Sequence, residues 1–320
     1  MNILITAPYH EAGRKQLQQI FGNVVYRVWK DIGRAYRADE LDRLLNETAA
    51  DALITEHDEV NKTVLENHPH LQFIGVCRGT PSNVDLVTAQ KLNIPVFNTP
   101  ARNAQAVAEM FIANVITLLR QVIPGTKWLR DRNWQKGAHT SYLQFKGNEL
   151  AGKTVGMVGF GAVGQRIAGI LKAFPCTVLY YDPYITHSFE HYKQVSLEEI
   201  FEKSDIVSIH LPVNDSTKGM INKSLLSRMR KDAIFVNTAR AVVVNRNDLL
   251  GAIESHSIGG AILDVFDHEP PDETDYRLID HPHVLATPHI AGATHEVEDH
   301  HVAILNEKLL RWKEEQNSHS

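Results

Sequence analysis

The sequence predicts an α/β protein made of two doubly wound parallel sheets, and three observations support this fold class. Its 320 residues are enough for roughly two domains of ~150 residues each. Short apolar runs alternate with helical patterns along most of the chain, as expected where a helix connects each pair of parallel strands. One apolar run also leads through a glycine-rich loop directly into a helical pattern, which is typical of doubly wound sheets.

The first part of the chain predicts one such sheet, covered by helices on both faces. Its apolar runs have the length of buried strands, and the segments between them carry helical spacing. The expected strands are residues 3–7, 24–28, 52–54, 73–77 and 96–98, and the expected helices are residues 11–21, 38–46 and 84–92. This part of the chain carries no glycine fingerprint, so it needs no cofactor to explain it.

Thr99 and Pro100 end the first part, and a second series of strands follows after a long helix. That helix is expected over residues 103–124, with apolar residues on more than one face, so we expect it to pack between domains or subunits. The expected strands are then residues 154–158, 177–181, 206–209, 233–237, 261–265 and 284–286. The expected helices are residues 197–203, 223–229, 247–256 and 296–312, the last followed by a frayed tail.

The glycine-rich loop is the sequence G-x-G-x-x-G that begins at Gly159. Gly159 allows a tight turn off the strand, Gly161 lets a pyrophosphate approach the backbone, and Gly164 lets the helix pack close to the sheet. The following helix presents free N–H groups and its positive dipole end to phosphates. Asp182 ends the next strand about 20 residues on, where an acid can accept hydrogen bonds from a ribose diol. Together these features predict a dinucleotide site.

The composition excludes several classes of protein. A net charge of −5 argues against a nucleic-acid partner, which favours a basic face. The two cysteines, Cys77 and Cys176, make no disulfide framework and favour a reducing cytoplasm. The N-terminus lacks a basic signal-peptide region, and polar residues interrupt the most apolar helix, so neither secretion nor a membrane span is expected.

Four side chains with catalytic chemistry follow strands in the second part of the chain. They are Arg240, Asp264, Glu269 and His289. Ligands of open α/β sheets bind beyond the carboxyl ends of the strands. An arginine can hold a carboxylate with two hydrogen bonds, and a histidine beside a carboxylate can pass a proton near neutral pH. The set predicts hydride chemistry on a carbonyl acid, although each residue taken alone is more often an ordinary residue without a role in a site.

Five motifs, in order, carry a resemblance to the D-isomer-specific 2-hydroxyacid dehydrogenases, which include phosphoglycerate dehydrogenases and glyoxylate or hydroxypyruvate reductases. The motifs are GKTVGMVGFGAVGQRIA, HLPVNDSTKGMIN, FVNTAR, AILDVFDHEP and TPHIAGAT. The resemblance covers nearly the whole chain. It implies a Rossmann cofactor domain, residues 99–290, inserted into a flavodoxin-like substrate domain, residues 1–98 plus 291–320. It also implies NAD as cofactor, a 2-hydroxy or 2-keto acid as substrate, and a homodimer formed through the cofactor domain.

The resemblance further implies a role for each matching residue. Arg240 would bind the substrate carboxylate and polarise the C2 oxygen, and His289, paired with Glu269, would be the general acid and base. Asp182 would hold the adenine-side ribose, and Asp264 would contact the nicotinamide amide. The other implied cofactor contacts are Gly159, Gly161, Ala162, Val163, Gly164, Pro212, Thr217 and Thr238.

The chain departs from the family pattern at three places. Ala241 replaces the usual glycine after the catalytic arginine, and an alanine at positive φ would strain that loop. Ala101 likewise stands where glycine is common. The first-domain loop CRGTPSNVDL is two residues shorter than usual, yet Arg78, Gly79 and Thr80 are still expected to face the substrate. Arg78 in particular is a candidate for binding a polar or anionic far end of the substrate.

Two other functions remain open at this point. Formate oxidation on the same fold would not need the pair of Glu269 and His289, so that pair argues against it. An NAD-sensing regulatory protein, as in the family's corepressor branch, would retain the same residues but turn over substrate poorly. No metal is expected, because His300 and His301 lack a thiol or the spacing of a zinc protease and fit a solvated helix start better.

Overall fold

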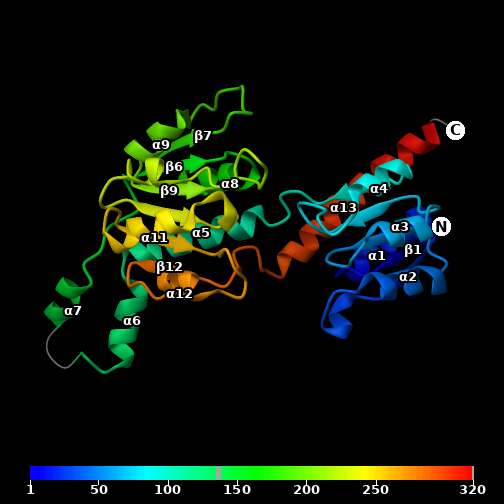
Figure 1. Cartoon of the computed structure of the whole chain (residues 1–320), viewed down its shortest axis with the longest axis horizontal. Coiled ribbons are helices and arrows are strands. Elements are labelled where there is room, and N and C mark those ends of the chain that lie inside the picture. The colour runs from blue at the N-terminus through cyan, green and yellow to red at the C-terminus, as the bar shows by residue number, and fades with distance from the viewer. Residues whose placement is uncertain (135–137, 319–320) are drawn as a thin grey trace. The chain divides into compact units, whose positions relative to one another are not determined.

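A computed structural model describes residues 1–134 and 138–318 of the chain. They form two compact units: unit 1 is Met1–Asn103 with Ala293–Ser320, and unit 2 is Ala104–Gly292 (Figure 1). The last two residues of the expected substrate domain, 319 and 320, lie outside the described residues. Each unit holds its own parallel sheet, as the alternation of strands and helices predicts.

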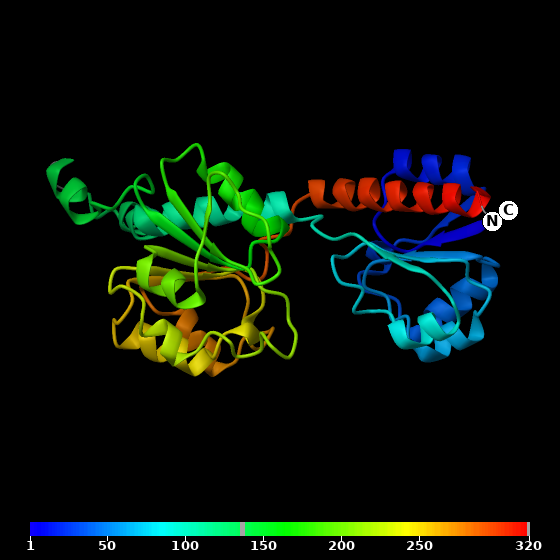
Figure 2. The ribbon, with the colours of Figure 1, turned by 90° about the horizontal axis from the view of Figure 1, so that it is seen from above.

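Unit 1 is built on a five-stranded parallel sheet in the order β2-β1-β3-β4-β5. Its strands are β1 (Asn2–Ile5), β2 (Asn23–Tyr26), β3 (Ala52–Thr55), β4 (Ile74–Val76) and β5 (Val96–Asn98). Its helices are α1 (Glu11–Phe21), α2 (Ala38–Glu47), α3 (Lys62–Asn67), α4 (Leu86–Lys91) and α13 (Glu296–Ser318), with a 3₁₀ turn at Trp29–Ile32. Helices α1 and α13 cover one face and the other three cover the opposite face (Figure 2).

The two faces of unit 1 follow from side-chain alternation along β1. Ile3 and Ile5 pack toward α1 and α13, whereas Leu4 packs toward α2, and all three are fully buried. Helix α13 lies so close to β4 that a Cβ on Gly75 would come within 2.8 Å of Leu305. The C-terminal helix is therefore a core element of unit 1.

Unit 2 is built on a seven-stranded parallel sheet in the order β12-β11-β10-β9-β6-β7-β8. Its strands are β6 (Thr154–Val158), β7 (Thr177–Tyr181), β8 (Lys193–Gln194), β9 (Ile206–Ile209), β10 (Ile234–Asn237), β11 (Gly260–Leu263) and β12 (Val284–Ala286). Helices α5 (Ala104–Leu119) and α8 (Ala162–Leu171) cover one face. The other face carries α9 (Leu197–Lys203), α10 (Lys223–Leu226), α11 (Arg246–Glu254) and α12 (Glu273–Ile279) (Figure 2).

The prediction of one long helix over residues 103–124 is wrong at the C-terminal end of that range. Helix α5 stops at Leu119, and a second helix, α6 (Val122–Arg130), begins after Gln121, whose φ of 52° interrupts the helical path. Helix α7 (Ala138–Gln144) then follows before β6. Among the described residues, no single helix is long and apolar enough to cross a membrane. Helices α5 and α6, bent by 63°, meet that condition only as a pair and only by length and composition.

Helix α13 corrects two expectations about the end of the chain. It continues to Ser318, so residues 316–318 of the expected frayed tail are helical. His301 is fully buried instead of lying at a solvated helix start. Its Nε2 lies 2.7 Å from the carbonyl oxygen of Pro8, and its Nδ1 lies 3.0 Å from Nη1 of Arg102. The ring therefore serves the packing of unit 1.

Candidate active site

The glycine loop joins β6 to α8, and its geometry requires glycine at two positions. Gly159 has a φ of +89°, and a Cβ there would lie 2.6 Å from the carbonyl oxygen of His210. A Cβ on Gly164 would lie 2.9 Å from the carbonyl oxygen of Gly159. Both contacts are closer than real Cβ atoms tolerate, so side chains there would push the loop or the helix away from the sheet.

The start of α8 is open in the way that an anion site requires. Gly161 is the N-cap residue, and among the described residues no side chain caps the helix there. Its sequence neighbours aside, no heavy atom of these residues lies within 4 Å of the position a Cβ would take. Gly161 and Ala162 are exposed, and Val163 is half-buried. The first N–H groups of an α-helix have no partner within the helix, so this end can donate hydrogen bonds to a phosphate.

Asp182 lies beside the glycine loop, as its position after β7 predicts. Its Oδ2 accepts a hydrogen bond from the N–H of Phe160 at 2.8 Å, and its Oδ1 accepts one from the N–H of Tyr184 at 3.0 Å. These two bonds fix the direction of the carboxylate. Each oxygen has a second lone pair, so the group can still accept hydrogen bonds from a ribose diol.

The other expected cofactor residues follow β9 and β10. Thr217 donates a hydrogen bond from Oγ1 to the carbonyl oxygen of Pro212 at 2.7 Å, so the structure brings these two residues together. The hydroxyl of Thr238 is buried and has no hydrogen-bond partner among the described residues. A buried hydroxyl without a partner is costly. It therefore fits a site where a bound dinucleotide would supply the partner.

The three expected catalytic residues line one pocket of about 630 Å³ within unit 2. Nδ1 of His289 lies 2.8 Å and 3.0 Å from the two carboxylate oxygens of Glu269. The side chains of His289 and Glu269 are 47% and 42% exposed, so both can be reached from solvent. Arg240 lies on the same pocket wall. Strand ends that are separate in sequence thus bring an arginine, a carboxylate and an imidazole together.

The loop that carries Arg240 is unstrained, which corrects the expectation for Ala241. Ala241 does not have a positive φ; it begins a 3₁₀ turn, Ala241–Val243. The backbone of Arg240 is extended, with a φ of −146°. The buried side chain of Asn237 supports the loop, because its Nδ2 donates to the carbonyl oxygen of Arg240 and its Oδ1 accepts from the N–H of Ala239, both at 3.0 Å. Alanine therefore fits this loop as it stands.

Asp264 holds the loop of His289, a role that the sequence did not reveal. Its carboxylate is 1% exposed and accepts hydrogen bonds from Oγ1 of Thr287 at 2.6 Å and from the N–H groups of Ile290 and Ala291 at 2.9 and 2.8 Å. His289 between them has a φ of 54°, a backbone conformation that surrounding contacts must maintain. Thr287, two residues before His289, is the feature of the sequence that could have indicated these hydrogen bonds. Contact of Asp264 with a nicotinamide stays a prediction.

The expected substrate residues of unit 1 follow the carboxyl end of β4. Arg78 is half-buried, while Gly79 and Thr80 are exposed. The carbonyl oxygen of Gly79 accepts a hydrogen bond from Nδ2 of Asn98 at 2.6 Å. Ala101, where the family commonly has glycine, does adopt a positive φ of 63°. Contact of the Arg78 loop with substrate stays a prediction.

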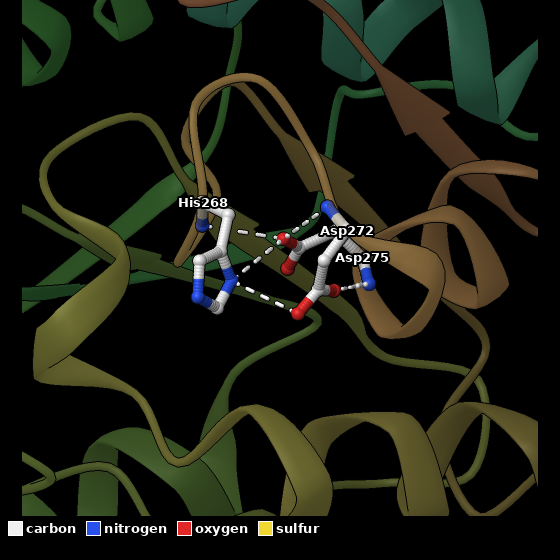
Figure 3. A group of neighbouring side chains, drawn as sticks. All are labelled: His268, Asp272 and Asp275. Carbon is white, nitrogen blue, oxygen red and sulfur yellow. Dashed lines mark hydrogen bonds and ion pairs between the residues drawn. The ribbon is translucent and has the colours of Figure 1, made fainter.

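A second charged cluster borders the pocket and was missed by sequence reasoning. His268, Asp272 and Asp275 place one potential ligand atom each within 4.8 Å of one another, a spacing that could hold a metal ion (Figure 3). Here Arg246 supplies positive charge, since its Nη1 lies 2.8 Å from Asp272 and 3.0 Å from Asp275. Hydrogen bonds from the backbone of Asp275 and from Arg246 lower the pKa of Asp272 to about 2. The acid-rich segment after Glu269 is the feature of the sequence that could have indicated this charged cluster.

Comparisons with known proteins place this site in a family. Residues 112–291 match the model of the D-isomer specific 2-hydroxyacid dehydrogenase, NAD binding domain. YoaD of Bacillus subtilis (strain 168), whose name describes it as a 2-hydroxyacid dehydrogenase, is 59% identical over 315 residues, which cover 98% of this chain and 92% of that protein. A glyoxylate reductase of Thermococcus litoralis is 32% identical over 317 residues, covering 97% and 93% of the two chains.

The fold itself matches solved structures. The structure of D-2-hydroxyisocaproate dehydrogenase superposes with a TM-score of 0.82 at 24% identity, covering 96% of this chain and 95% of that one. The predicted fold class, with its two parallel-sheet α/β units, is confirmed, and so are the predicted family and the predicted cofactor, NAD. The chain belongs to the D-isomer specific 2-hydroxyacid dehydrogenase family, and its unit 2 is that family's NAD-binding domain.

Proposed function

We propose that this protein transfers a hydride between NAD(H) and C2 of a small D-2-hydroxy or 2-keto acid. The observation that supports this proposal best is the meeting of Arg240, Glu269 and His289 in one pocket. That pocket belongs to the same unit as the glycine loop and Asp182. When bound, NADH supplies the hydride that reduces the C2 carbonyl.

Arg240 is proposed to bind the substrate's C1 carboxylate and to polarise its C2 oxygen. Its side chain is exposed on the pocket wall. Among the described residues, its guanidinium donates one hydrogen bond, from Nη1 to the carbonyl oxygen of Ala239 at 2.7 Å. Guanidinium has five N–H donors in a planar fork that matches a carboxylate. Several donors are therefore left for substrate.

His289 is proposed to give a proton to the C2 oxygen in reduction and to take it back in oxidation. Since Nδ1 faces Glu269, the carboxylate holds the ring in the tautomer that donates from Nδ1. The opposite nitrogen, Nε2, is then the one that exchanges a proton with substrate. In the reductive direction, the protonated ring would donate its proton from Nε2 to the C2 oxygen.

The direct test is NADH oxidation with a panel of 2-keto acids that includes glyoxylate and hydroxypyruvate, and NAD reduction with D- and L-2-hydroxy acids. We expect turnover, with only the D-isomers oxidised. Arg240→Gln should lose at least a hundredfold in kcat/KM, whereas Arg228→Gln, which alters an exposed arginine of the same unit, should not. Tight NADH binding without turnover of any acid would instead favour a regulatory NAD sensor.

We further propose that unit 2 mediates a homodimer. Helices α6 and α7 extend away from the seven-stranded sheet (Figure 1). Both helices expose large apolar side chains. Leu129 is 53% exposed, and Tyr142 and Leu143 are each 71% exposed. Large apolar side chains that are exposed to this degree favour burial in an interface. Light scattering should report a dimer, which Leu143→Glu should weaken. The control variant Leu86→Glu, on α4, should leave the dimer intact. A monomeric wild-type protein would contradict the proposal.

A further inference from the structure

The segment from β11 to α12 carries Glu269, and its two flanks are tied to a pair of acids at the start of α12. Oδ2 of Asp275 accepts hydrogen bonds from the N–H groups of His268 and Asp272, both at 3.2 Å. Oδ1 of Asp272 accepts one from the N–H of Asp275 at 2.8 Å. His268 directly precedes Glu269, so these bonds hold the backbone on both sides of the catalytic carboxylate.

Arg246, the first residue of α11, joins this segment from a different element. Its Nη1 lies 2.8 Å from Oδ1 of Asp272 and 3.0 Å from Oδ1 of Asp275, and its Nε lies 3.3 Å from Oδ2 of Asp267. The side chain is 20% exposed, and Asp275 is 1% exposed. One guanidinium thus contacts three carboxylates, of which one precedes Glu269 and two follow it.

The three carboxylates around Arg246 explain why a positive charge is needed at this place. Three carboxylates within reach of one another repel, and Asp275 is cut off from water. Removing the partner of a buried charge is more damaging than removing an exposed pair, because the remaining charge is neither solvated nor compensated. The cluster His268, Asp272 and Asp275 has the ligand spacing of a cation site (Figure 3). Arg246 supplies the positive charge beside it.

Glu269 depends on this support for its direction. Its Oε1 accepts a hydrogen bond from the N–H of Phe266 at 3.3 Å and also lies 3.0 Å from Nδ1 of His289. With its side chain 42% exposed, Glu269 has little packing of its own to hold it. The order of the surrounding loop therefore decides how often the carboxylate faces the imidazole.

We propose that Arg246 is a positioning residue for the reaction, which acts by holding the Glu269 loop so that its carboxylate meets His289. This inference rests on the proposed function of the Glu269 and His289 pair. Although Arg246 also lines the pocket, its guanidinium is engaged by Asp267, Asp272 and Asp275, so it is not proposed to bind substrate. Loss of Arg246 should consequently lower kcat and leave the KM for keto acid nearly unchanged.

The experiment compares Arg246→Met and Arg246→Lys with Arg277→Met as a matched control. Arg277 lies on α12 and makes an exposed pair with Glu254 at 2.6 Å. We expect kcat to fall about tenfold or more in Arg246→Met, to recover only in part in Arg246→Lys, and to stay unchanged in Arg277→Met. NADH affinity, measured by fluorescence, should stay within about twofold in all three. A raised KM with unchanged kcat would overturn the proposal.

A double-mutant cycle with Glu269→Gln separates positioning from a general structural effect. If Arg246 acts through Glu269, Arg246→Met should cost about tenfold in the wild-type background and almost nothing in the Glu269→Gln background. An equal loss in both backgrounds would overturn the proposal. Should Arg246→Met fail to fold, Asp267→Asn removes one contact of the guanidinium and should give a smaller loss with the same dependence on Glu269.

The cycle also keeps the two proposals distinguishable. If Glu269→Gln alone leaves kcat at the wild-type value, the proposed role of Glu269 fails, and the positioning role of Arg246 fails with it. If Glu269→Gln lowers kcat but neither Arg246→Met nor Asp267→Asn does, only the inference about Arg246 fails.

Discussion

The two units use the same junction, from a central strand into a helix, for different purposes. In unit 1, β1 leads to α1, and the side chain of its N-cap residue His10 accepts a hydrogen bond from the N–H of Gly13 at 2.9 Å. In unit 2, β6 leads to α8, where the N-cap is Gly161 and no side chain caps the helix. The first helix satisfies one of its own free N–H groups, while the second leaves them for a ligand.

Charged side chains show the same contrast: those of unit 1 pair with one another, whereas those of unit 2 remain available to a ligand. In unit 1, Arg102 lies 2.7 Å from Glu56 and 3.0 Å from the buried ring of His301, so these groups compensate one another inside the unit. In unit 2, Arg240, Glu269 and His289 face a pocket. The difference teaches that a doubly wound sheet acquires a site where its loops leave polar groups for a ligand, and that the architecture alone does not provide one.

The largest expected effect is on kcat, and it should distinguish His289 of unit 2 from His10 of unit 1. Each of these histidines follows a strand of its unit. His289→Ala is expected to lower kcat by about 10²–10⁴, the usual contribution of general acid–base catalysis. His10→Ala removes a helix cap and an exposed pair with Asp299, so it should cost about 1 kcal/mol of stability and leave kcat unchanged. Steady-state kinetics and thermal unfolding of both variants test this contrast. A comparable loss of kcat in His10→Ala would place catalytic chemistry in unit 1 as well.

Asp182 should make the cofactor site selective for NAD(H) over NADP(H). A 2′-phosphate about 4 Å from this carboxylate would meet repulsion of roughly 1–4 kcal/mol, which is fivefold to a thousandfold in selectivity. Asp182→Asn removes the charge and should lower the ratio of kcat/KM for NADH over NADPH by tenfold or more. Asp232→Asn, at an exposed aspartate before β10, is the control. Equal kcat/KM of the wild-type protein for both cofactors would contradict this expectation.

Gly161 should matter for binding and not for folding. Apart from its sequence neighbours, no described residue has a heavy atom within 4 Å of its Cβ position, so Gly161→Ala should fold normally. The methyl group would nevertheless project where a pyrophosphate approaches. We expect the Kd for NADH to rise about tenfold, which is ~1.4 kcal/mol. Gly169→Ala, an equally open position within α8, should leave the Kd unchanged. If both variants bind NADH alike, the open end of α8 is not the phosphate site.

The smallest effect concerns the pH dependence of stability in unit 1. Burial lowers the pKa of His301 from its ordinary value, so the folded state holds this ring neutral while the unfolded chain takes up a proton. Stability is therefore complete above pH 6.5 and falls as the pH drops below it, by at most about 1.4 kcal/mol per pH unit. Chemical unfolding between pH 7 and 5 should show a shallower loss in His301→Gln than in the wild-type protein. The exposed neighbour variant His300→Gln should keep the wild-type slope.

Features that depend on local residue spacing could be predicted from the amino-acid sequence. The alternation of short apolar runs with helical patterns predicted both parallel sheets, and β6, β7, β9 and β12 have the predicted bounds. The glycine loop and Asp182 predicted an arrangement that the bond from Phe160 to Asp182 displays. Strand ends also predicted which residues to consider together, because the carboxyl ends of parallel strands share one edge of a sheet.

Tertiary structure decided what depends on contacts between distant segments. The spacing of residues along the sequence could not show that α5 ends at Leu119 or that His301 is buried. Nor could it show that Asp264 holds the loop of His289. It likewise could not show that Arg246 meets three acids more than twenty residues away. Burial and ion pairing are properties of packed surfaces, and the partners of a side chain are set by which helix and loop lie against it.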